Sequence, residues 1–435
     1  MNVVEVDGSP EAVRALTRAL SDALDGGDTV LPLASGRAKG GLGYALCTQG
    51  HLGLAPAVVI RTSGSTGTPK GVLLSARALT ASAAATHARL VGPGHWLLAT
   101  PAHYIGGLQV LVRSLLAGTE PGVLDLSGGF QPEAFTQVSK ALPEEGPRYT
   151  ALVPTQLARL LDAGKADVAA SFDAIIIGGA ALPPELRERA EDHGVRVISA
   201  YGMSETAGGC VYDGVPLDGV RVAADVPGAA GATAGAASGA VSDTATSGAV
   251  SGAAGPGTAG GPAGSAGSAG SAGSAGGPTG RVRLTGTVLA DGYLNDDAAA
   301  SSESAAFRDG WFLTNDLGRI TPDGRLEILG RADDVINTGG VKVAAHTIAD
   351  ALRSHRGVRD ACVVGVPDPD WGEAVVAAVV PDDPSQPPAP DDLAAHVRAA
   401  LGAPSVPKRV RFLAELPLRG PGKPDRDAVR RLLGA

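Results

Sequence analysis

Short apolar runs alternate with helical stretches over much of this chain, and this alternation limits its fold more than any other feature of the sequence. The apolar runs lie at residues 96–99, 149–153, 174–177 and 195–198, and the stretches between them include residues 155–163 and 184–192. Such short apolar runs are typical of buried strands, and the intervening stretches have the period of helices. Repeated strand and helix favour an α/β fold, in which helices sandwich a sheet. We predict this architecture from about residue 58 to residue 225.

The pattern restarts after residue 331, which indicates a second and smaller folding unit. The elements expected there are strands at residues 361–366 and 374–380 and helices at residues 347–354 and 393–401. A chain of 435 residues is also too long for one ordinary hydrophobic core. We therefore expect a large N-terminal domain at residues 1–330 and a small C-terminal α+β domain at residues 331–435.

A low-complexity segment interrupts the larger unit at residues 227–280. It consists mostly of Gly, Ala, Ser, Thr and Pro, a composition that cannot bury enough apolar surface to fold. Because residues 219–223 and 281–284 on either side both have strand patterns, we expect a disordered insertion in place of a hairpin turn. A linker between domains is the alternative. Residues 255–260 (GPGTAG) match the dinucleotide fingerprint only formally, since no strand precedes them and no helix follows.

Charge and cysteine content exclude several classes of function. The formal net charge of −9 argues against unaided binding to nucleic acid or to an anionic membrane. Three widely spaced cysteines, Cys47, Cys210 and Cys362, make neither a disulfide framework nor a metal cluster. The N-terminus lacks the basic and apolar residues of an export signal, and no run of about 18 apolar residues occurs. We expect a cytoplasmic protein with no membrane insertion and no nucleic-acid partner.

A polar, glycine-rich run at residues 61–71 (RTSGSTGTPKG) follows directly after an apolar strand pattern. Its glycines let backbone N–H groups converge on an anion, its hydroxyls add neutral donors, and Lys70 supplies a compact positive charge. These properties suit a polyphosphate. The spacing is not that of the common nucleotide loop, because Pro69 stands where that loop needs its second glycine. A flexible Gly/Ser/Thr linker is the alternative.

Two further segments follow predicted strands, at the position where open α/β sheets bind ligands. In residues 200–206 (AYGMSET), Tyr201 can stack on a base, Ser204 can donate to a phosphate and Glu205 can ligate Mg²⁺. Residues 177–182 (IGGAAL) end another strand in glycines, which can place flat backbone against an adenine. An ordinary turn is the alternative for both segments.

Later residues suit ribose, phosphate and carboxylate groups. Asp316 can accept hydrogen bonds from both ribose hydroxyls, and Arg331 can donate to ribose or phosphate. A surface ion pair between Arg331 and the two acids in residues 329–336 (LGRADDVI) is the alternative. Lys423 ends a Gly/Pro-rich stretch at residues 416–423 (LPLRGPGK), where a lone lysine is usually a solvated charge.

The run at residues 61–71 resembles the phosphate-loop signature of the adenylate-forming superfamily, which includes acyl-CoA synthetases, luciferases and peptide-synthetase adenylation domains. Further motifs of that superfamily occur in the same order at residues 177–182, 200–206, 310–318, 329–336 and 416–423. The resemblance implies a large adenylation domain, a small mobile C-terminal domain, and the cofactors ATP, Mg²⁺ and coenzyme A. The ATP-binding residues that it implies are Thr62, Ser63, Gly64, Ser65, Thr66, Gly67, Lys70, Gly179, Ala180, Tyr201, Gly202, Ser204, Asp316, Arg331 and Lys423.

The same resemblance implies roles for residues outside the nucleotide site. Glu205 corresponds to the magnesium ligand, Asp333 to the hinge between the domains, and Gly339 and Gly340 to the lining of a narrow tunnel for the thiol of coenzyme A. Lys423 stands where the superfamily has its adenylation lysine, whose ammonium would bridge carboxylate and α-phosphate oxygens. By analogy with single oxyanion donors, that electrostatic role is worth roughly 10²–10³ in rate.

The gate of the acyl pocket departs from the superfamily pattern. Most members have Pro-x-x-His-x-x-Gly, whereas here His103 comes one place early and Tyr104 stands at the histidine position. We take His103 and Tyr104, together with Lys423, as the candidate catalytic residues. Residues 344–349 also lack the usual Pro-x-Glu-x-Glu that follows the glycine pair.

Within the superfamily, the chain resembles the actinobacterial o-succinylbenzoate-CoA ligases of menaquinone synthesis. This narrower resemblance rests on the short lead before the phosphate loop and on residues 100–109, 151–157 and 208–219. It implies a ligase that converts 2-succinylbenzoate and ATP to an acyl-adenylate, from which the thiol of coenzyme A displaces AMP. The expected partners are these small molecules, and a homodimer is left open.

Three alternatives remain. The same chemistry on another acyl or aryl carboxylate is compatible with the superfamily motifs. A nonenzymatic nucleotide-binding or scaffolding protein could interact through residues 227–280, although intact site residues argue against it. A carrier-protein-loading adenylation domain is weakened because no downstream carrier segment follows.

Overall fold

The structure, a computed structural model, describes residues 1–36, 56–62, 70–225, 277–294, 306–420 and 423–434. Residues 227–276 of the insertion predicted to be disordered at 227–280, with the formal fingerprint at 255–260, therefore lie outside the described residues. In the described part of the chain, no helix is both long and apolar enough to cross a membrane.

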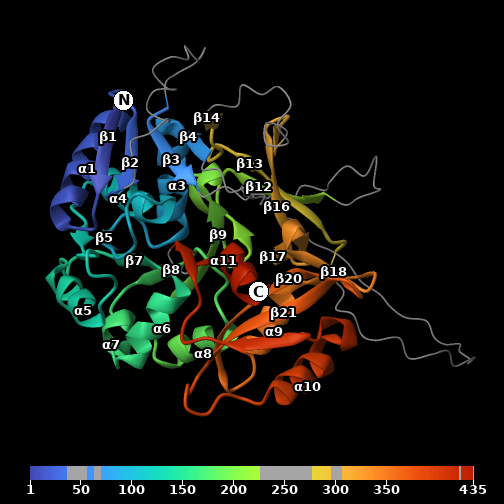
Figure 1. The fold of residues 1–435 in the computed structure, drawn as a ribbon. Coiled ribbons are helices and arrows are strands. Elements are labelled where there is room, and N and C mark those ends of the chain that lie inside the picture. The colour runs from blue at the N-terminus through green and yellow to red at the C-terminus, as the bar shows by residue number, and fades with distance from the viewer. Residues whose placement is uncertain (37–55, 63–69, 226–276, 295–305, 421–422, 435) are drawn as a thin grey trace, which may run out of the picture.

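Two sheets flanked by helices form most of the N-terminal part, which confirms the predicted α/β fold (Figure 1). The first sheet has the order β1 (Asn2–Val6), β2 (Val30–Ala34), β3 (Val58–Thr62), β4 (Lys70–Leu74) and β14 (Gly292–Leu294). The second has the order β11 (Val215–Pro216), β10 (Gly208–Tyr212), β9 (Val197–Met203), β8 (Ala174–Ile177), β7 (Arg148–Leu152), β5 (His95–Leu98) and β6 (Gly122–Val123). The helices of this part are α1 (Pro10–Leu24), α3 (Ala76–Arg89), α4 (Ile105–Ala117), α5 (Pro132–Ala141), α6 (Pro154–Asp162), α7 (Ala166–Ala170) and α8 (Pro184–Asp192).

The middle of the second sheet is parallel and positions several site segments. β5, β7, β8 and β9 pair in parallel, so their carboxyl ends meet at one edge. The segments after β5 and β8, and the C-terminal half of β9, hold the residues predicted to bind acid and nucleotide. This is the edge at which open α/β sheets bind ligands.

The strands on either side of the low-complexity segment pair with each other, as predicted. β12 (Val220–Asp225) and β13 (Gly280–Gly286) are antiparallel, with Asp225 opposite Arg281. Gly280 already belongs to β13, so the predicted segment at 227–280 extends too far at its C-terminal end. The hairpin belongs to a third sheet, in which β13 pairs with β16 (Trp311–Ile320), and β16 also pairs with β15 (Phe307–Arg308) and β17 (Leu326–Arg331).

This pairing predicts that the low-complexity segment can be removed. When residues 226–279 are replaced by one asparagine, Asn-Gly280 forms a two-residue turn between the opposed Asp225 and Arg281. Each halving of loop length returns only about 0.6 kcal/mol, so the midpoint of thermal unfolding should stay equal or rise slightly. A direct junction of Asp225 to Gly280 breaks the register and serves as the destabilised control. If the midpoint of thermal unfolding also fell clearly in the asparagine variant, the segment would support the fold.

A fourth sheet forms the C-terminal part (Figure 1). Its order is β19 (Val341–Ala344), β18 (Val335–Thr338), β21 (Gly372–Pro381) and β20 (Val358–Asp368), with β22 (Arg409–Phe412) also paired to β21. The accompanying elements are α9 (Ala345–Arg353), α10 (Pro390–Leu401), α11 (Arg426–Leu433) and the short strands β23 (Leu418–Gly420) and β24 (Lys423–Pro424). The predicted strands and helices of this part are present within a few residues of their expected bounds.

The buried apolar residues fall into clusters that separate near residue 331. Among the described residues, the clusters of the N-terminal sheets end at Leu326, and those of the fourth sheet begin at Ile336. The short segment between these two residues carries charged side chains of the candidate site.

Candidate active site

β3 and β4 hold the two ends of the predicted phosphate loop next to each other. Thr62 ends β3 directly opposite Lys70, which begins β4. The loop residues Ser63, Gly64, Ser65, Thr66 and Gly67 lie outside the described residues. The Lys70 ammonium lies 5.2 Å from the centre of the Tyr293 ring, and the Tyr293 hydroxyl donates to Glu205 Oε1 at 2.9 Å. One aromatic side chain thus brings the predicted phosphate lysine and the predicted magnesium ligand close together.

β9 is longer than the sequence indicated, which corrects the placement of one motif. The strand was expected to end at Ile198, but it continues to Met203, so Tyr201 and Gly202 lie within the strand instead of a loop. The extension occurs because β10 folds back and pairs with β9. Gly202 allows the close approach, since a Cβ there would lie 2.1 Å from the carbonyl oxygen of Gly208. Ser204 and Glu205 leave the sheet in a single 3₁₀ turn.

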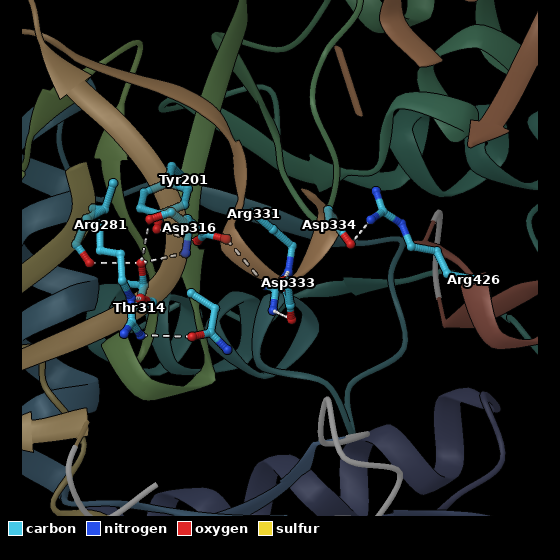
Figure 2. Close-up of polar contacts among 10 residues, drawn as sticks. Tyr201, Arg281, Thr314, Asp316, Arg331, Asp333, Asp334 and Arg426 are labelled. Atoms are coloured by element: carbon cyan, nitrogen blue, oxygen red, sulfur yellow. Dashed lines mark hydrogen bonds and ion pairs between the residues drawn. The ribbon is translucent and has the colours of Figure 1, made fainter. Parts of the chain in front are cut away.

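Three motifs that are distant in the sequence meet at Asp316 (Figure 2). The Tyr201 hydroxyl donates to Asp316 Oδ2 at 2.6 Å, and Arg331 Nη1 donates to Asp316 Oδ1 at 3.3 Å. Asp316 and Arg331 are cross-strand partners on β16 and β17, which explains their contact. Arg331 also binds Asp333 with two hydrogen bonds of 2.8 Å. The ion pair proposed as the alternative for this motif is therefore present, and Arg331 contacts Asp316 as well.

This arrangement shifts the pKa values of Tyr201, Arg331 and Asp333. Burial raises the pKa of Tyr201, and the charge of Asp316 raises it further, so the hydroxyl remains a donor. Desolvation acts to lower the pKa of Arg331, but hydrogen bonds and charge from Asp333 and the charge of Asp316 raise it overall. Desolvation acts to raise the pKa of Asp333, yet its bonds to Arg331 hold the pKa below the ordinary value. These groups form a fixed donor and acceptor set suited to ribose hydroxyls and a phosphate.

Lys423 faces the same set of charges from the C-terminal part of the chain. It begins β24, and its side chain keeps contact with solvent. Desolvation by the surrounding protein lowers its pKa, the positive charge of Arg331 lowers it further, and Asp316 and Glu205 oppose both effects. The predicted adenylation lysine therefore lies within electrostatic range of the predicted ribose and magnesium ligands.

A single carboxylate near Lys70 fits the way that Mg²⁺ is held with nucleotides. Among the described residues, no group of three or more His, Cys, Asp or Glu side chains could hold a metal ion without other ligands. Glu205 accepts from Tyr293 through Oε1. One carboxylate combined with phosphate oxygens and water is the usual magnesium arrangement in nucleotide enzymes, so the residues present fit that ion.

The remaining predicted residues lie near the parallel sheet edge or on the fourth sheet. Gly179 and Ala180 are exposed directly after β8. His103 and Tyr104 lie just before α4, with ring centres 4.2 Å apart. Gly339 and Gly340 form the turn between β18 and β19, with φ of +59° and +79°. At Gly339 a Cβ would lie 2.7 Å from the Trp371 ring, so glycine is required there for packing as well as for conformation.

One charged residue behind the site was missed from the sequence. Arg113 lies on α4 with 3% of its surface exposed, and none of the described acids pairs with it. Its Nη2 lies 3.4 Å from the Tyr212 hydroxyl, and its guanidinium lies 4.9 Å from the centre of the Trp96 ring. Its Nε has no hydrogen-bond partner among the described residues. The signal was present in the sequence as a lone cation inside the apolar helix at residues 105–117.

Neighbouring polar groups around Arg113 also lack partners in the part of the chain that the structure describes. Nε2 of His87 and Nε1 of Trp96 are buried and form no hydrogen bond there. Burial lowers the pKa of His87 to about 4, with the charge of Arg113 acting in the same direction, so the imidazole is neutral. We name His87, Trp96, Arg113 and Tyr212 the Arg113 cluster. A buried cation without an acid is costly, and this cluster offers donors to an acceptor that the described residues do not provide.

The Arg113 cluster is connected to the site by one turn of helix. Gln109, four residues before Arg113 on α4, donates to the carbonyl oxygen of Ala207 at 2.7 Å. Gly208 packs on the same side chain, because a Cβ there would lie 3.1 Å from Gln109 Cγ. Ala207 and Gly208 follow Glu205 by two and three residues, so the cluster lies behind the turn that carries the predicted magnesium ligand.

Comparison with known proteins finds relatives over nearly the whole chain. The family model of AMP-binding enzymes matches residues 53–262, and that of the AMP-binding enzyme C-terminal domain matches residues 347–423. The probable 2-succinylbenzoate--CoA ligase of Mycobacterium tuberculosis is 39% identical over 97% of this chain and 96% of its own length. The sulfoacetate--CoA ligase of Cupriavidus necator is 35% identical over 84% of this chain and 65% of its own length.

A solved structure supports the same relationship at the level of fold. The o-succinylbenzoate CoA synthetase of Bacillus subtilis, in complex with its acyl-adenylate intermediate, matches with a TM-score of 0.68. The match has 22% identity and covers 95% of this chain and 80% of that chain. At this identity the likeness shows the fold alone.

Proposed function

Since the chain belongs to the AMP-binding enzyme family and is an acid–thiol ligase of the AMP-forming acyl-CoA synthetase type, we propose that its acid is 2-succinylbenzoate, ligated to coenzyme A in menaquinone biosynthesis. Family membership confirms the superfamily resemblance inferred from the motifs. The identity of the relative from Mycobacterium tuberculosis supports the choice of acid. A cytoplasmic location and a homodimer stay predictions.

The proposed reaction has two steps. A carboxylate oxygen of the acid attacks the α-phosphorus of ATP, and the bond to pyrophosphate breaks, which leaves an acyl-adenylate. The sulfur of coenzyme A then attacks the acyl carbon, its proton is lost, and AMP leaves with the electron pair of the broken C–O bond. Mg²⁺ neutralises phosphate charge when bound beside Glu205. A carboxylate must first be converted to the adenylate, because without it the thiol would have to displace oxide, which is a very poor leaving group.

Individual side chains have assigned roles in this proposal. Asp316 accepts from the ribose hydroxyls, and Arg331 holds Asp316 in place and donates toward the nucleotide. Lys423 stabilises the charge that moves between the carboxylate and the α-phosphate during the first step. The separation of the apolar clusters near residue 331 supports a small domain at residues 331–435 that rotates at Asp333. Gly339 and Gly340 then line the path of the thiol.

The other residues named from the sequence motifs also have proposed roles. The residues proposed to bind the ATP phosphates are Thr62, Ser63, Gly64, Ser65, Thr66, Gly67 and Lys70. Those proposed to bind the nucleoside or the α-phosphate are Gly179, Ala180, Tyr201, Gly202 and Ser204. The acid substrate is bordered by His103 and Tyr104. For Tyr201 the bond to Asp316 favours a role in orienting that carboxylate as well as contact with the base.

The Arg113 cluster is the observation that carries the choice of acid. 2-Succinylbenzoate has two carboxylates, so one remains charged after the other is activated. Arg113, which is buried behind the Ser204–Thr206 turn and has no acid partner among the described residues, supplies the opposite charge for that second carboxylate. Aliphatic monoacids would leave the cation unpaired, which supports a dianionic substrate over a fatty acid.

A panel of acids tests this function. With ATP, Mg²⁺ and coenzyme A present, release of AMP should show the highest kcat/KM with 2-succinylbenzoate. Benzoate and a fatty acid should be poorer because they lack the second carboxylate. Sulfoacetate should also be poorer, because only one methylene separates its two acidic groups. If benzoate or the fatty acid matched 2-succinylbenzoate, the enzyme would be a ligase for another carboxylic acid.

A further inference from the structure

Arg426 joins the C-terminal helix to the segment next to the predicted hinge. It is the first residue of α11, and its Nη1 forms an ion pair with Asp334 Oδ1 (Figure 2). Asp334 follows Asp333 directly and is buried, with 8% of its side chain exposed. An acid this buried requires a partner, and Arg426 is the partner that the structure provides.

Arg426 also lies close to Lys423 along a constrained stretch of chain. Lys423 and Pro424 form β24, in which Lys423 pairs with Gly420. Asp425 then caps α11 by accepting from the backbone N–H of Ala428, and its own N–H donates to the Pro417 carbonyl oxygen at 2.7 Å. Few torsions are free between Lys423 and Arg426, so the position of one restricts the other.

The helix that follows is fixed to the fourth sheet. Val429 and Leu433 of α11 are buried against apolar residues of β20 and β21, including Val364, Val366 and Val376. This apolar contact holds the helix, and the ion pair is made by the first residue of the helix, two positions after β24 ends.

The surroundings of Arg426 connect it to the charges around the nucleotide site. Burial lowers the pKa of Arg426 to about 10, and the positive charge of Arg331 acts in the same direction. The negative charge of Asp333 opposes both effects. Arg426 therefore lies among the residues at the predicted hinge, with Asp334 as its direct partner.

We propose that Arg426 is a positioning residue: through its ion pair with Asp334 it fixes the strand that carries Lys423 to the hinge segment, so that Lys423 reaches the reacting groups during adenylate formation. This inference rests on the proposed function. It adds that the alignment of Lys423 depends on a contact made three residues later in the chain. The thiol step should not depend on this contact, because Lys423 has no part in it.

Measurement of the two half-reactions with separate assays tests the inference. Adenylate formation is followed by 2-succinylbenzoate-dependent exchange of labelled pyrophosphate into ATP, and the thiol step by the reaction of synthetic acyl-adenylate with coenzyme A. Arg426→Gln should slow the exchange by about 10²-fold, the effect of an approximately 1 Å misplacement of a reacting group, and change the thiol step little. Arg426→Lys should restore part of the exchange rate, since it keeps the charge.

Arg430→Gln is the matched control. Arg430 lies one turn later on α11 and pairs with Asp427 at the surface, so its loss should leave both half-reactions unchanged. Asp334→Asn should reproduce the Arg426→Gln effect, and the double variant should be no worse than either single one. Thermal unfolding of each variant shows whether it is folded.

Two results would overturn the inference. One is an Arg426→Gln enzyme with an unchanged exchange rate; the other is an equal loss in both half-reactions, which would make the contact merely structural. Failure of the proposed function has a different signature, because the wild-type protein itself would then show no exchange with 2-succinylbenzoate.

Discussion

Replacement of Lys423 with alanine is expected to slow adenylate formation about 10²–10³-fold, the effect of removing one preorganised charge from a transition state. The side chain lies within electrostatic range of Asp316, Glu205 and Arg331, where partial desolvation strengthens each charge interaction. The measurement is pyrophosphate exchange with saturating 2-succinylbenzoate. The KM for ATP should change much less, because Asp316 and Arg331 remain to hold the nucleoside.

The thiol step distinguishes a catalytic loss from general damage. Synthetic acyl-adenylate should react with coenzyme A at nearly the wild-type rate in Lys423→Ala, since the proposed rotation of the small domain would remove this lysine before the thiol enters. Lys140→Ala, an exposed lysine on α5, is the surface control and should match the wild type in both assays. Full pyrophosphate exchange by Lys423→Ala would remove this lysine from the proposed mechanism.

Replacement of Arg113 with methionine is expected to raise the KM for 2-succinylbenzoate at least about 30-fold, since loss of one partner of a buried charge pair costs about 2–5 kcal/mol. The kcat with benzoate should change little, because benzoate has no second carboxylate to pair. Activity with each acid is compared by AMP release. Arg113→Lys should be intermediate, because an ammonium keeps the charge but lacks the planar fork of guanidinium.

The free protein gives an independent test of the same residue. Arg113 has no acid partner among the described residues, and its Nε is unbonded. Methionine has a similar volume and needs no partner, so Arg113→Met should unfold at the same temperature as the wild type or higher. A variant that loses activity equally toward every acid, or that unfolds at a much lower temperature, would contradict a role in substrate selection.

The local parts of the fold followed from the sequence because periodicity and turn residues act over short distances. The strands β5, β7 and β8 have the expected lengths, and the helices α6 and α8 lie within one residue of the stretches predicted as helical. β9 was the exception. Its extension to Met203 depends on pairing with β10, and strand pairing is a contact between segments that composition alone does not specify.

The motif residues of the candidate site could be named from the sequence, but most of the contacts between them could not. Asp316, Arg331 and Lys423 could be named from motifs, and the residues on either side of the low-complexity segment could be paired as a hairpin. The bond between Tyr201 and Asp316 joins residues 115 positions apart, and the contact of Arg113 with Tyr212 joins residues 99 positions apart. The ion pair of Arg426 with Asp334 likewise joins the first residue of α11 to the segment next to the predicted hinge.

The sequence by itself therefore determined the α/β class, several of the helices and strands, and the family to which the motifs point, since each depends on residue type and spacing. Only the tertiary structure showed that Arg113 is a buried cation with no acid partner among the described residues and that Arg426 pairs with Asp334, next to the predicted hinge. Burial and the pairing of charges arise when distant elements pack together and exclude water, and a linear pattern carries no record of which charges then face one another.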